Sequence, residues 1–155
     1  MPVRYQLVID CEDPELLARF WAAALGYVLQ PPPRGFATWD DYRRDIGLPD
    51  DMLGRGPDSI IDPLGEGPRI WFNALPEAKV VKNRLHLDIH ATNWHRGTID
   101  RSVPRATRKE LVNAEARRLA ELGATITGPL GDDDEDVDHY AVGMKDPEGN
   151  EFDIN

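Results

Sequence analysis

Polar residues that can bind metals or carry protons alternate with aliphatic residues over positions 85–90. Neighbouring side chains of a strand face opposite sides, so His86, Asp88 and His90 share one face and the aliphatic residues share the other. Imidazole and carboxylate groups serve both as metal ligands and as proton donors or acceptors. The pattern therefore predicts a half-buried strand with a chemically capable face. A plain surface strand shows the same alternation, so this segment needs support from the rest of the chain.

A first strand and a helix are predicted near the start of the chain. Residues 4–10 alternate in the same way, and Asp13-Pro14 is typical of a helix N-cap followed by proline at the first helical position. Gly26 is typical of a left-handed helix end. We therefore expect a helix over residues 14–25. Its apolar side chains recur at helical spacing and should form the buried face: Leu17, Phe20, Trp21 and Ala24.

A second helix is predicted over residues 107–122, because Thr107 and Glu110 have the spacing of a capping box. Gly123 should end this helix. The side chains expected to face the core are Val112, Ala116, Leu119 and Leu122. Short strands are predicted at residues 27–30, 58–62, 69–75, 125–127, 139–144 and 151–155.

Parity within these strands predicts which side chains face away from the helices. Trp71 stands between two apolar residues, and Asp153 does so as well. The apolar neighbours should face the helices, which turns Trp71 and Asp153 to the opposite side. Gln6 has the same parity in residues 4–10. We expect Gln6, Trp71, His86 and Asp153 to converge on one cavity.

Residues 31–56 are the least regular part of the chain, apart from a short helix predicted at residues 39–46. A loop of this length in a compact domain is either disordered or a lid over a site. We favour a lid, because Trp39, Tyr42 and Met52 would have no use in a disordered tether.

Two halves of the chain read alike. Each has a strand, a helix that ends in Leu-Gly, and three short strands with an Asp-Pro-x-Gly turn before the last. The turns are residues 62–65 and 146–149, and the final strands are residues 70–73 and 152–155. Internal duplication of this kind predicts two βαβββ units, each with one sheet face left open. Pairing the two units would close a shared concavity.

These motifs resemble the vicinal oxygen chelate superfamily of glyoxalases, bleomycin-resistance proteins and extradiol dioxygenases, and its glyoxalase-like branch in particular. Residues 13–27, 82–88 and 146–152 carry the resemblance. It implies an α+β fold within a single domain, residues 1–155. Two tandem βαβββ modules, residues 1–76 with the insertion 31–56 and residues 82–155, would form a curved mixed sheet around a shared cavity, with the helices outside.

The resemblance also implies up to four metal ligands, on the first and last strand of each module. Carried over to this sequence, these positions are Gln6, Trp71, His86 and Asp153. An indole cannot ligate a metal, which leaves Gln6, His86 and Asp153 for a divalent ion such as Zn, Ni, Fe or Mn. The site can also be metal-free, in which case His86 and Asp153 simply form a hydrogen bond.

Two functions fit this pattern. In the first, the protein is a lyase, isomerase or dioxygenase for a small oxygen-rich substrate; its ion acts as a Lewis acid, and Asp88 or His90 transfers a proton. In the second, it is a metal-free protein of the bleomycin-resistance type that sequesters a drug or aromatic metabolite. The residues expected to contact the small-molecule ligand are Trp39, Trp71, Asn73 and Arg84.

The composition excludes several other classes of protein. The formal net charge of −10, to which the acidic run at residues 132–136 contributes, argues against binding to nucleic acid or an anionic membrane surface. The single cysteine, Cys11, excludes an intramolecular disulfide and a cysteine-rich zinc site. No apolar run approaches the roughly 20 residues of a membrane span. We expect a cytoplasmic protein, and the resemblance implies a homodimer.

Overall fold

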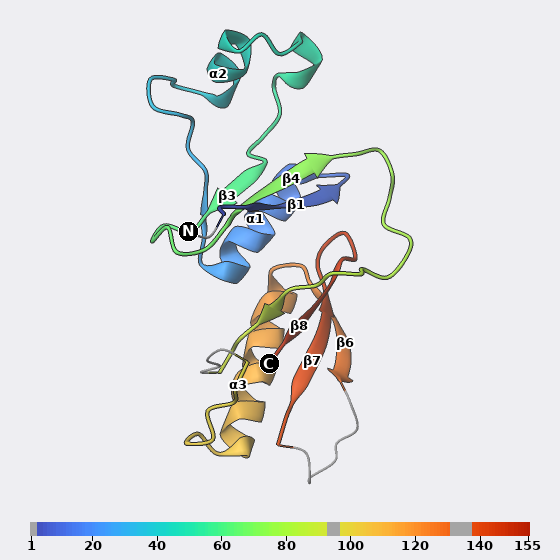
Figure 1. Ribbon diagram of the computed structural model, residues 1–155. Helices are drawn as coiled ribbons and strands as arrows, with labels where there is room; N and C mark the ends of the chain where they lie inside the picture. Colours follow the sequence, from blue (N-terminus) through green and yellow to red (C-terminus); the bar gives the residue numbers. More distant parts are fainter. Residues whose placement is uncertain (1–2, 93–96, 131–137) are drawn as a thin grey trace. The chain divides into compact units, whose positions relative to one another are not determined.

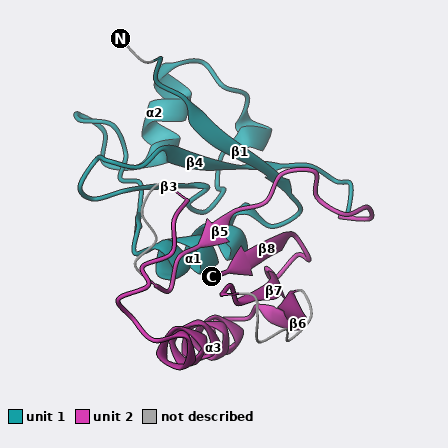
Figure 2. Cartoon of the chain, turned by 60° about the horizontal axis from the view of Figure 1, so that its bottom comes forward, with its two compact units in different colours: residues 1–78 teal, residues 79–155 magenta. Residues whose placement is uncertain are grey.

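The computed structural model describes residues 3–92, 97–130 and 138–155. The chain divides into two compact units, residues 1–78 (unit 1) and residues 79–155 (unit 2), which Figure 2 distinguishes by colour. Each unit has one four-stranded mixed sheet with a helix packed against it (Figure 1). The acidic run predicted to carry much of the negative charge lies outside the described residues.

Unit 1 follows the order strand, helix and three strands. Its elements are β1 (Gln6–Cys11), α1 (Pro14–Leu25), β2 (Val28–Leu29), β3 (Ser59–Ile61) and β4 (Arg69–Ala74). The strands lie in the order β1-β4-β3-β2, with β1 parallel to β4 and the other neighbours antiparallel. Two short helices, α2 (Trp39–Asp45) and η1 (Asp50–Met52), fall between β2 and β3. The short helix predicted in the insertion is therefore confirmed.

Helix α1 begins and ends where the sequence predicts. Asp13 Oδ1 accepts a hydrogen bond from the backbone N–H of Leu16 at 3.0 Å, and Gly26 ends the helix with a φ of 69°. The predicted apolar stripe of α1 is buried and packs on β3 and β4. Phe20 is only 4% exposed, which confirms it as a core residue. The strand residues that complete this core are Ile60, Ile70 and Phe72.

Unit 2 repeats the order of unit 1. Its elements are β5 (Asp88–Ile89), α3 (Arg105–Glu121), β6 (Thr125–Leu130), β7 (Ala141–Lys145) and β8 (Glu151–Ile154). The strands lie in the order β5-β8-β7-β6, with β5 parallel to β8. Helix α3 packs on β6, β7 and β8, and Leu119 is fully buried as predicted. The other core residues of this unit include Val112, Ala116, Val142, Met144, Phe152 and Ile154.

The predicted start of the second helix is wrong. Helix α3 begins at Arg105, after Pro104, so Thr107 lies inside the first turn and forms no capping box with Glu110. Arg108 secures this earlier start, since its backbone N–H donates to Pro104 O and its Nε donates to Val103 O, each at 3.0 Å. The core prediction fails at Leu122, which is 41% exposed because the helix has already ended.

The strand predicted at residues 85–90 is much shorter than its alternation indicates. Only Asp88–Ile89 forms a strand, and Leu85 is 87% exposed instead of facing the core. Strand β5 is an edge strand with β8 as its single neighbour, so no second strand holds the residues that the pairing with β8 leaves out. Its backbone pairing with β8 begins at Leu87 O, which accepts from Asp153 N–H, so the preceding residues are not held in a ladder.

Both units have the βαβββ order, which confirms the predicted α+β fold of two modules. Within the described residues, no helix is long and apolar enough to cross a membrane.

Candidate functional site

Three of the predicted site residues lie together in unit 2. His86 Nε2 is 3.1 Å from Asp153 Oδ2 and 3.3 Å from Asp88 Oδ1. One ligand atom from each residue lies within 4.8 Å of the other two. The side chains are partly accessible, with exposed fractions of 42% for His86, 44% for Asp88 and 23% for Asp153. A small ligand can therefore reach the group from solvent.

The sheet of unit 2 positions this cluster. Strand β8 lies between β5 and β7, and Asp153 is paired in register with Asp88 of β5. Phe152 and Ile154, on either side of Asp153, are buried in the core under α3. Their burial turns Asp153 to the face of the sheet opposite the helix, as strand parity predicts.

His86 precedes β5 and is positioned by the segment around it. Glu151 accepts hydrogen bonds from the backbone N–H of Asn83 and from Lys79 Nζ, both at 2.9 Å. Lys79 also donates to Val81 O. The Asn83 hydrogen bond and the Lys79 contact lower the pKa of Glu151 to about 2. This clamp of Lys79, Asn83 and Glu151 fixes one side of His86, and the Leu87 pairing with β8 fixes the other.

Burial raises the pKa of Asp153 above its ordinary value. Electrostatic interactions with His86 and Lys82 oppose this shift, whereas the negative charge of Asp88 adds to it. Two neighbouring carboxylates, of which Asp153 is partly buried, favour the approach of a cation, because a cation relieves their mutual repulsion.

The donor set of the cluster fits a divalent metal ion. One imidazole nitrogen and two carboxylate oxygens are ligands that Mn²⁺, Fe²⁺ and Zn²⁺ accept. Ligand atoms about 2.1 Å from an ion and at right angles to each other stand about 3 Å apart. The observed separations of 3.1 and 3.3 Å are close to this spacing.

Asn155 is a site residue that sequence reasoning missed. It is 5% exposed; its Nδ2 donates to Asp88 Oδ2 at 3.3 Å, and its Oδ1 lies 2.5 Å from His90 Nδ1. Asn155 thus links His90 to Asp88, so His90 lies beside the cluster and connects to it through one side chain. The matching final strands of the internal repeat, in which Asn73 corresponds to Asn155, are the signal that could have identified it.

The predicted site residues of unit 1 make different contacts. Gln6 Oε1 accepts a hydrogen bond from Arg69 Nη1 at 2.8 Å. Trp71 Nε1 donates to Asp58 Oδ2 at 3.4 Å. Ile70 and Phe72 are buried beneath α1, so Trp71 occupies the opposite face as predicted. On this face the amide oxygen of Gln6 is already engaged with a guanidinium group.

The insertion is attached to the same sheet through polar contacts. Trp39 Nε1 donates to the backbone oxygen of Gln30 at 2.9 Å. Arg43, 7% exposed, pairs with Asp40 at 3.0 Å and with Asp58 at 3.1 Å. Because Asp58 also accepts from Trp71, helix α2 is connected through Arg43 to the open face of the unit 1 sheet. The role of the insertion as a lid stays a prediction.

The remaining predicted residues contribute less to the described geometry. Asn73 Nδ2 donates to Asp10 Oδ1 at 2.9 Å, and Arg84 is exposed to solvent. The predicted convergence of Gln6 and Trp71 with His86 and Asp153 joins residues of different units, and it stays a prediction.

The chain is similar to one known domain family over nearly all its length. Residues 6–155 match the model of the glyoxalase-like domain. A comparison with curated proteins gave no significant match.

Several solved structures share the fold. A glyoxalase/bleomycin resistance protein/dioxygenase family enzyme from Burkholderia phytofirmans PsJN is 19% identical, with a TM-score of 0.54, over 97% of this chain and 94% of that one. A member of the glyoxalase/bleomycin resistance protein/dioxygenase superfamily from Sphaerobacter thermophilus is 14% identical, with a TM-score of 0.51. This match covers 99% of this chain and 96% of that one.

A third similar structure contains a metal ion. It is a variant of the fosfomycin resistance protein FosX from Listeria monocytogenes, in complex with Mn(II) and 1S,2S-dihydroxypropylphosphonic acid. It is 9% identical, with a TM-score of 0.56, over 100% of this chain and 92% of that one. At these identities, the three structures establish a shared fold alone.

Proposed function

The chain belongs to the glyoxalase-like domain family, and on this premise we propose that it is a metal-dependent enzyme for a small oxygen-rich substrate. The reaction would be that of a lyase, an isomerase or a dioxygenase. The observation that carries the proposal is the cluster of His86, Asp88 and Asp153, whose three donor atoms lie within 4.8 Å of one another. In this proposal Asp88, predicted as a proton carrier, becomes the third ligand.

The residues around the cluster have distinct tasks in this proposal. His86 supplies the nitrogen ligand, and Asp153 and Asp88 supply carboxylate oxygens. When bound, a divalent ion acts as a Lewis acid toward a carbonyl or enediolate oxygen. Asn155 orients Asp88 by donating to its Oδ2. His90, exposed and joined to the cluster through Asn155, is the group positioned to accept or donate a proton.

A Mn²⁺ titration of chelator-treated protein tests the metal site. Isothermal titration calorimetry should find one Mn²⁺ per chain, and His86→Ala should weaken binding at least about 100-fold, because the only nitrogen ligand of the cluster is lost. His139→Ala is the matched control, since His139 is an exposed histidine in the same unit. Equal Mn²⁺ affinity in wild type and His86→Ala would refute the proposed site.

A metal-free binding protein is the second candidate function. The observation that favours it is in unit 1, where the internal repeat puts Trp71 at the position of Asp153 and where Arg69 already occupies the oxygen of Gln6. An indole on an open sheet face suits a flat aromatic ligand. Under this function, ligand binding would be equal with and without a chelator, and equal in wild type and His86→Ala.

A further inference from the structure

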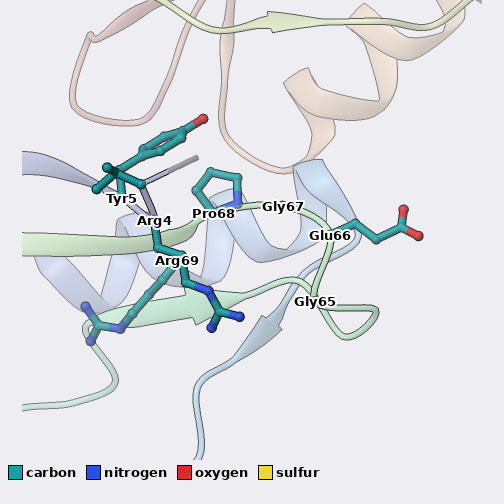
Figure 3. Close-up of a pocket in the computed structure, with 8 residues that line it drawn as sticks. Arg4, Tyr5, Gly65, Glu66, Gly67, Pro68 and Arg69 are labelled. Carbon is teal, nitrogen blue, oxygen red and sulfur yellow. The ribbon is translucent and has the colours of Figure 1, made fainter. Parts of the chain in front are cut away.

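Unit 1 has a surface pocket that is lined by its own residues alone. Its volume is about 500 Å³, and residues 3–5 and 65–69 line it. The first group precedes β1, and the second forms the turn that leads into β4. Figure 3 shows that the two arginine side chains of this pocket, Arg4 and Arg69, extend to the same side.

Arg69 is partly buried, and its hydrogen-bond partners among the residues that the structure describes are neutral groups. Its Nε donates to Gln30 Oε1 at 2.6 Å, and its Nη1 donates to Gln6 Oε1 at 2.8 Å. Among the described residues, no carboxylate lies within ion-pair distance of Arg69. Asp58, which forms an ion pair with Arg43, stabilises the charged form of Arg69 at longer range.

This arrangement differs from that of the two arginines that are fully buried in the described part of the chain. Arg43 and Arg108, 7% and 6% exposed, each pair directly with an aspartate. Removing a guanidinium from water is costly, so a partly buried arginine normally has an anionic partner. Burial lowers the pKa of Arg69, as expected for a cation that loses water without a full counter-charge.

The geometry of Arg69 leaves part of its hydrogen-bonding capacity unused. A guanidinium has five N–H donors in a planar fork that matches the two oxygens of a carboxylate or phosphate. Two of these donors are engaged with the glutamine oxygens, which fix the plane of the group. Arg4 is exposed and adds a second positive charge at the pocket.

The turn of the pocket does not compete for a ligand. The backbone N–H groups of Glu66 and Gly67 donate to Asp62 Oδ2, at 2.9 and 2.8 Å. These hydrogen bonds fix the turn and engage the Asp62 carboxylate. In Figure 3 the Glu66 carboxylate points away from the arginine guanidinium groups. The positive groups therefore dominate the side of the pocket that the arginines line.

We propose that this pocket binds a small oxyanion, a carboxylate or a phosphate or phosphonate group, through the guanidinium of Arg69 with Arg4 as the second cation. Gln6 and Gln30 are positioning residues that orient Arg69. The proposal does not depend on a metal in unit 2, and it assigns Gln6 to an anion site instead of a metal site.

The test is a titration of metal-free protein at low ionic strength with inorganic phosphate, and separately with succinate. Arg69→Gln should weaken binding about tenfold or more, as expected for the loss of charge-assisted hydrogen bonds. Arg69→Lys should also weaken it severalfold, because lysine keeps the charge and loses the fork. Arg4→Gln should weaken binding about threefold. Arg34→Gln, which removes an equal charge from an exposed position of the same unit, is the control and should bind as wild type does.

The possible outcomes separate clearly. A preference for phosphate identifies a phosphate or phosphonate ligand, and a preference for succinate identifies a carboxylate. The proposal is overturned if neither probe binds the wild type with a Kd below about 10 mM, because a higher Kd means binding weaker than that of specific sites. It is also overturned if Arg4→Gln and Arg69→Gln bind as well as Arg34→Gln.

Should Arg69→Gln fail to fold, Arg4→Gln decides the matter, since the exposed Arg4 side chain makes no hydrogen bond within the described residues. His86→Ala should retain anion binding, which distinguishes this site from the metal site.

Discussion

The two units use the same pairing of strands to present different side chains. Strands β1 and β4 are parallel neighbours in unit 1, as β5 and β8 are in unit 2. At one end of each pair the side chains behave alike. Asn73 hydrogen bonds to Asp10 across the strands of unit 1, and Asn155 contacts His90 across the strands of unit 2. This shared asparagine shows which positions of the two units correspond.

The central positions differ in kind. Val8 is paired in register with Trp71 in unit 1, whereas Asp88 is paired with Asp153 in unit 2. An apolar pair offers a surface for flat ligands and no metal ligand, whereas an acidic pair attracts a cation. At the next position on the same face of the strands, the two units also differ in charge.

Gln6 is paired with Arg69 in unit 1. The corresponding residues of unit 2 in the internal repeat are His86, which precedes the paired part of β5, and Glu151 of β8. Arg69 donates to Gln6 and engages its oxygen. Glu151 is instead engaged by Lys79 and Asn83, so His86 Nε2 is left to face the two aspartates. Two of the three positions compared thus separate a cationic site from an acidic one on the same backbone pattern.

The largest effects are expected where the two units are alike, in their cores. Phe20 of α1 and Leu119 of α3 are 4% and 0% exposed. Truncation of either residue to alanine should lower the free energy of unfolding by about 3 kcal/mol, because it removes buried surface and leaves a cavity. Urea denaturation measures the change. Leu64→Ala, at a position 79% exposed, is the control. A change below about 0.5 kcal/mol for either core variant would mean that the units differ in their packing as well.

The next effect sharpens the difference at the central positions. Asp153→Asn keeps the shape of the side chain and removes its charge, so Mn²⁺ binding should weaken about 100-fold while the fold is retained. Asp45→Asn, at an exposed position of α2 in the other unit, is the matched control. Calorimetric titration measures both. If Asp153→Asn bound Mn²⁺ as tightly as wild type does, the acidic pair of unit 2 would have no more chemical role than the apolar pair of unit 1.

The clamp beside His86 should have a smaller effect. Glu151→Gln weakens the hydrogen bonds to Lys79 and Asn83. The segment before β5 can then move, and the cluster is less preorganised for a metal ion. Loss of such a supporting contact typically weakens metal binding about tenfold. Glu121→Gln, at the exposed end of α3, makes the same chemical change away from the site. Equal Mn²⁺ affinity for the two variants would show that His86 is positioned by β5 alone.

Strand parity predicted the faces of β4 and β8 correctly because both strands lie inside their sheets. Their apolar residues have a helix on one side, so the residue between them has only one direction left. The same reasoning failed at Leu85, since an edge strand with one neighbour can end early and leave an aliphatic side chain exposed. Alternation alone does not distinguish these two cases.

Contacts that no short sequence motif contains were the other limit of prediction. The N-terminus of α3 is held by Arg108 reaching back to Val103, a contact that the local capping pattern at Thr107 does not contain. The Asn155 to Asp88 hydrogen bond joins residues 67 positions apart. Arg69 likewise has the neutral partners Gln6 and Gln30 instead of a carboxylate, and no short motif brings these residues together.

The smallest predicted effect distinguishes the two Asp-Pro-x-Gly turns. Asp146 is supported by the side chain of Asn150. Within the described part of the chain, Asp62 accepts only from backbone N–H groups, those of Leu64, Glu66 and Gly67. The hydrogen bonds from Leu64 and Gly67 are the main cause of the lowered pKa of Asp62.

A carboxyl group whose pKa is lower in the folded state stabilises the fold above its unfolded pKa of about 3.9, and this contribution is lost as the pH falls through the folded pKa. Asp62→Asn should therefore be less stable than wild type at pH 7, and the difference should shrink as the pH falls below about 4. Urea denaturation of both proteins between pH 7 and pH 3 measures it. A difference that stayed constant over this range would show that the charge of Asp62 has no part in fixing the turn, and that the turns of the two units are held by shape alone.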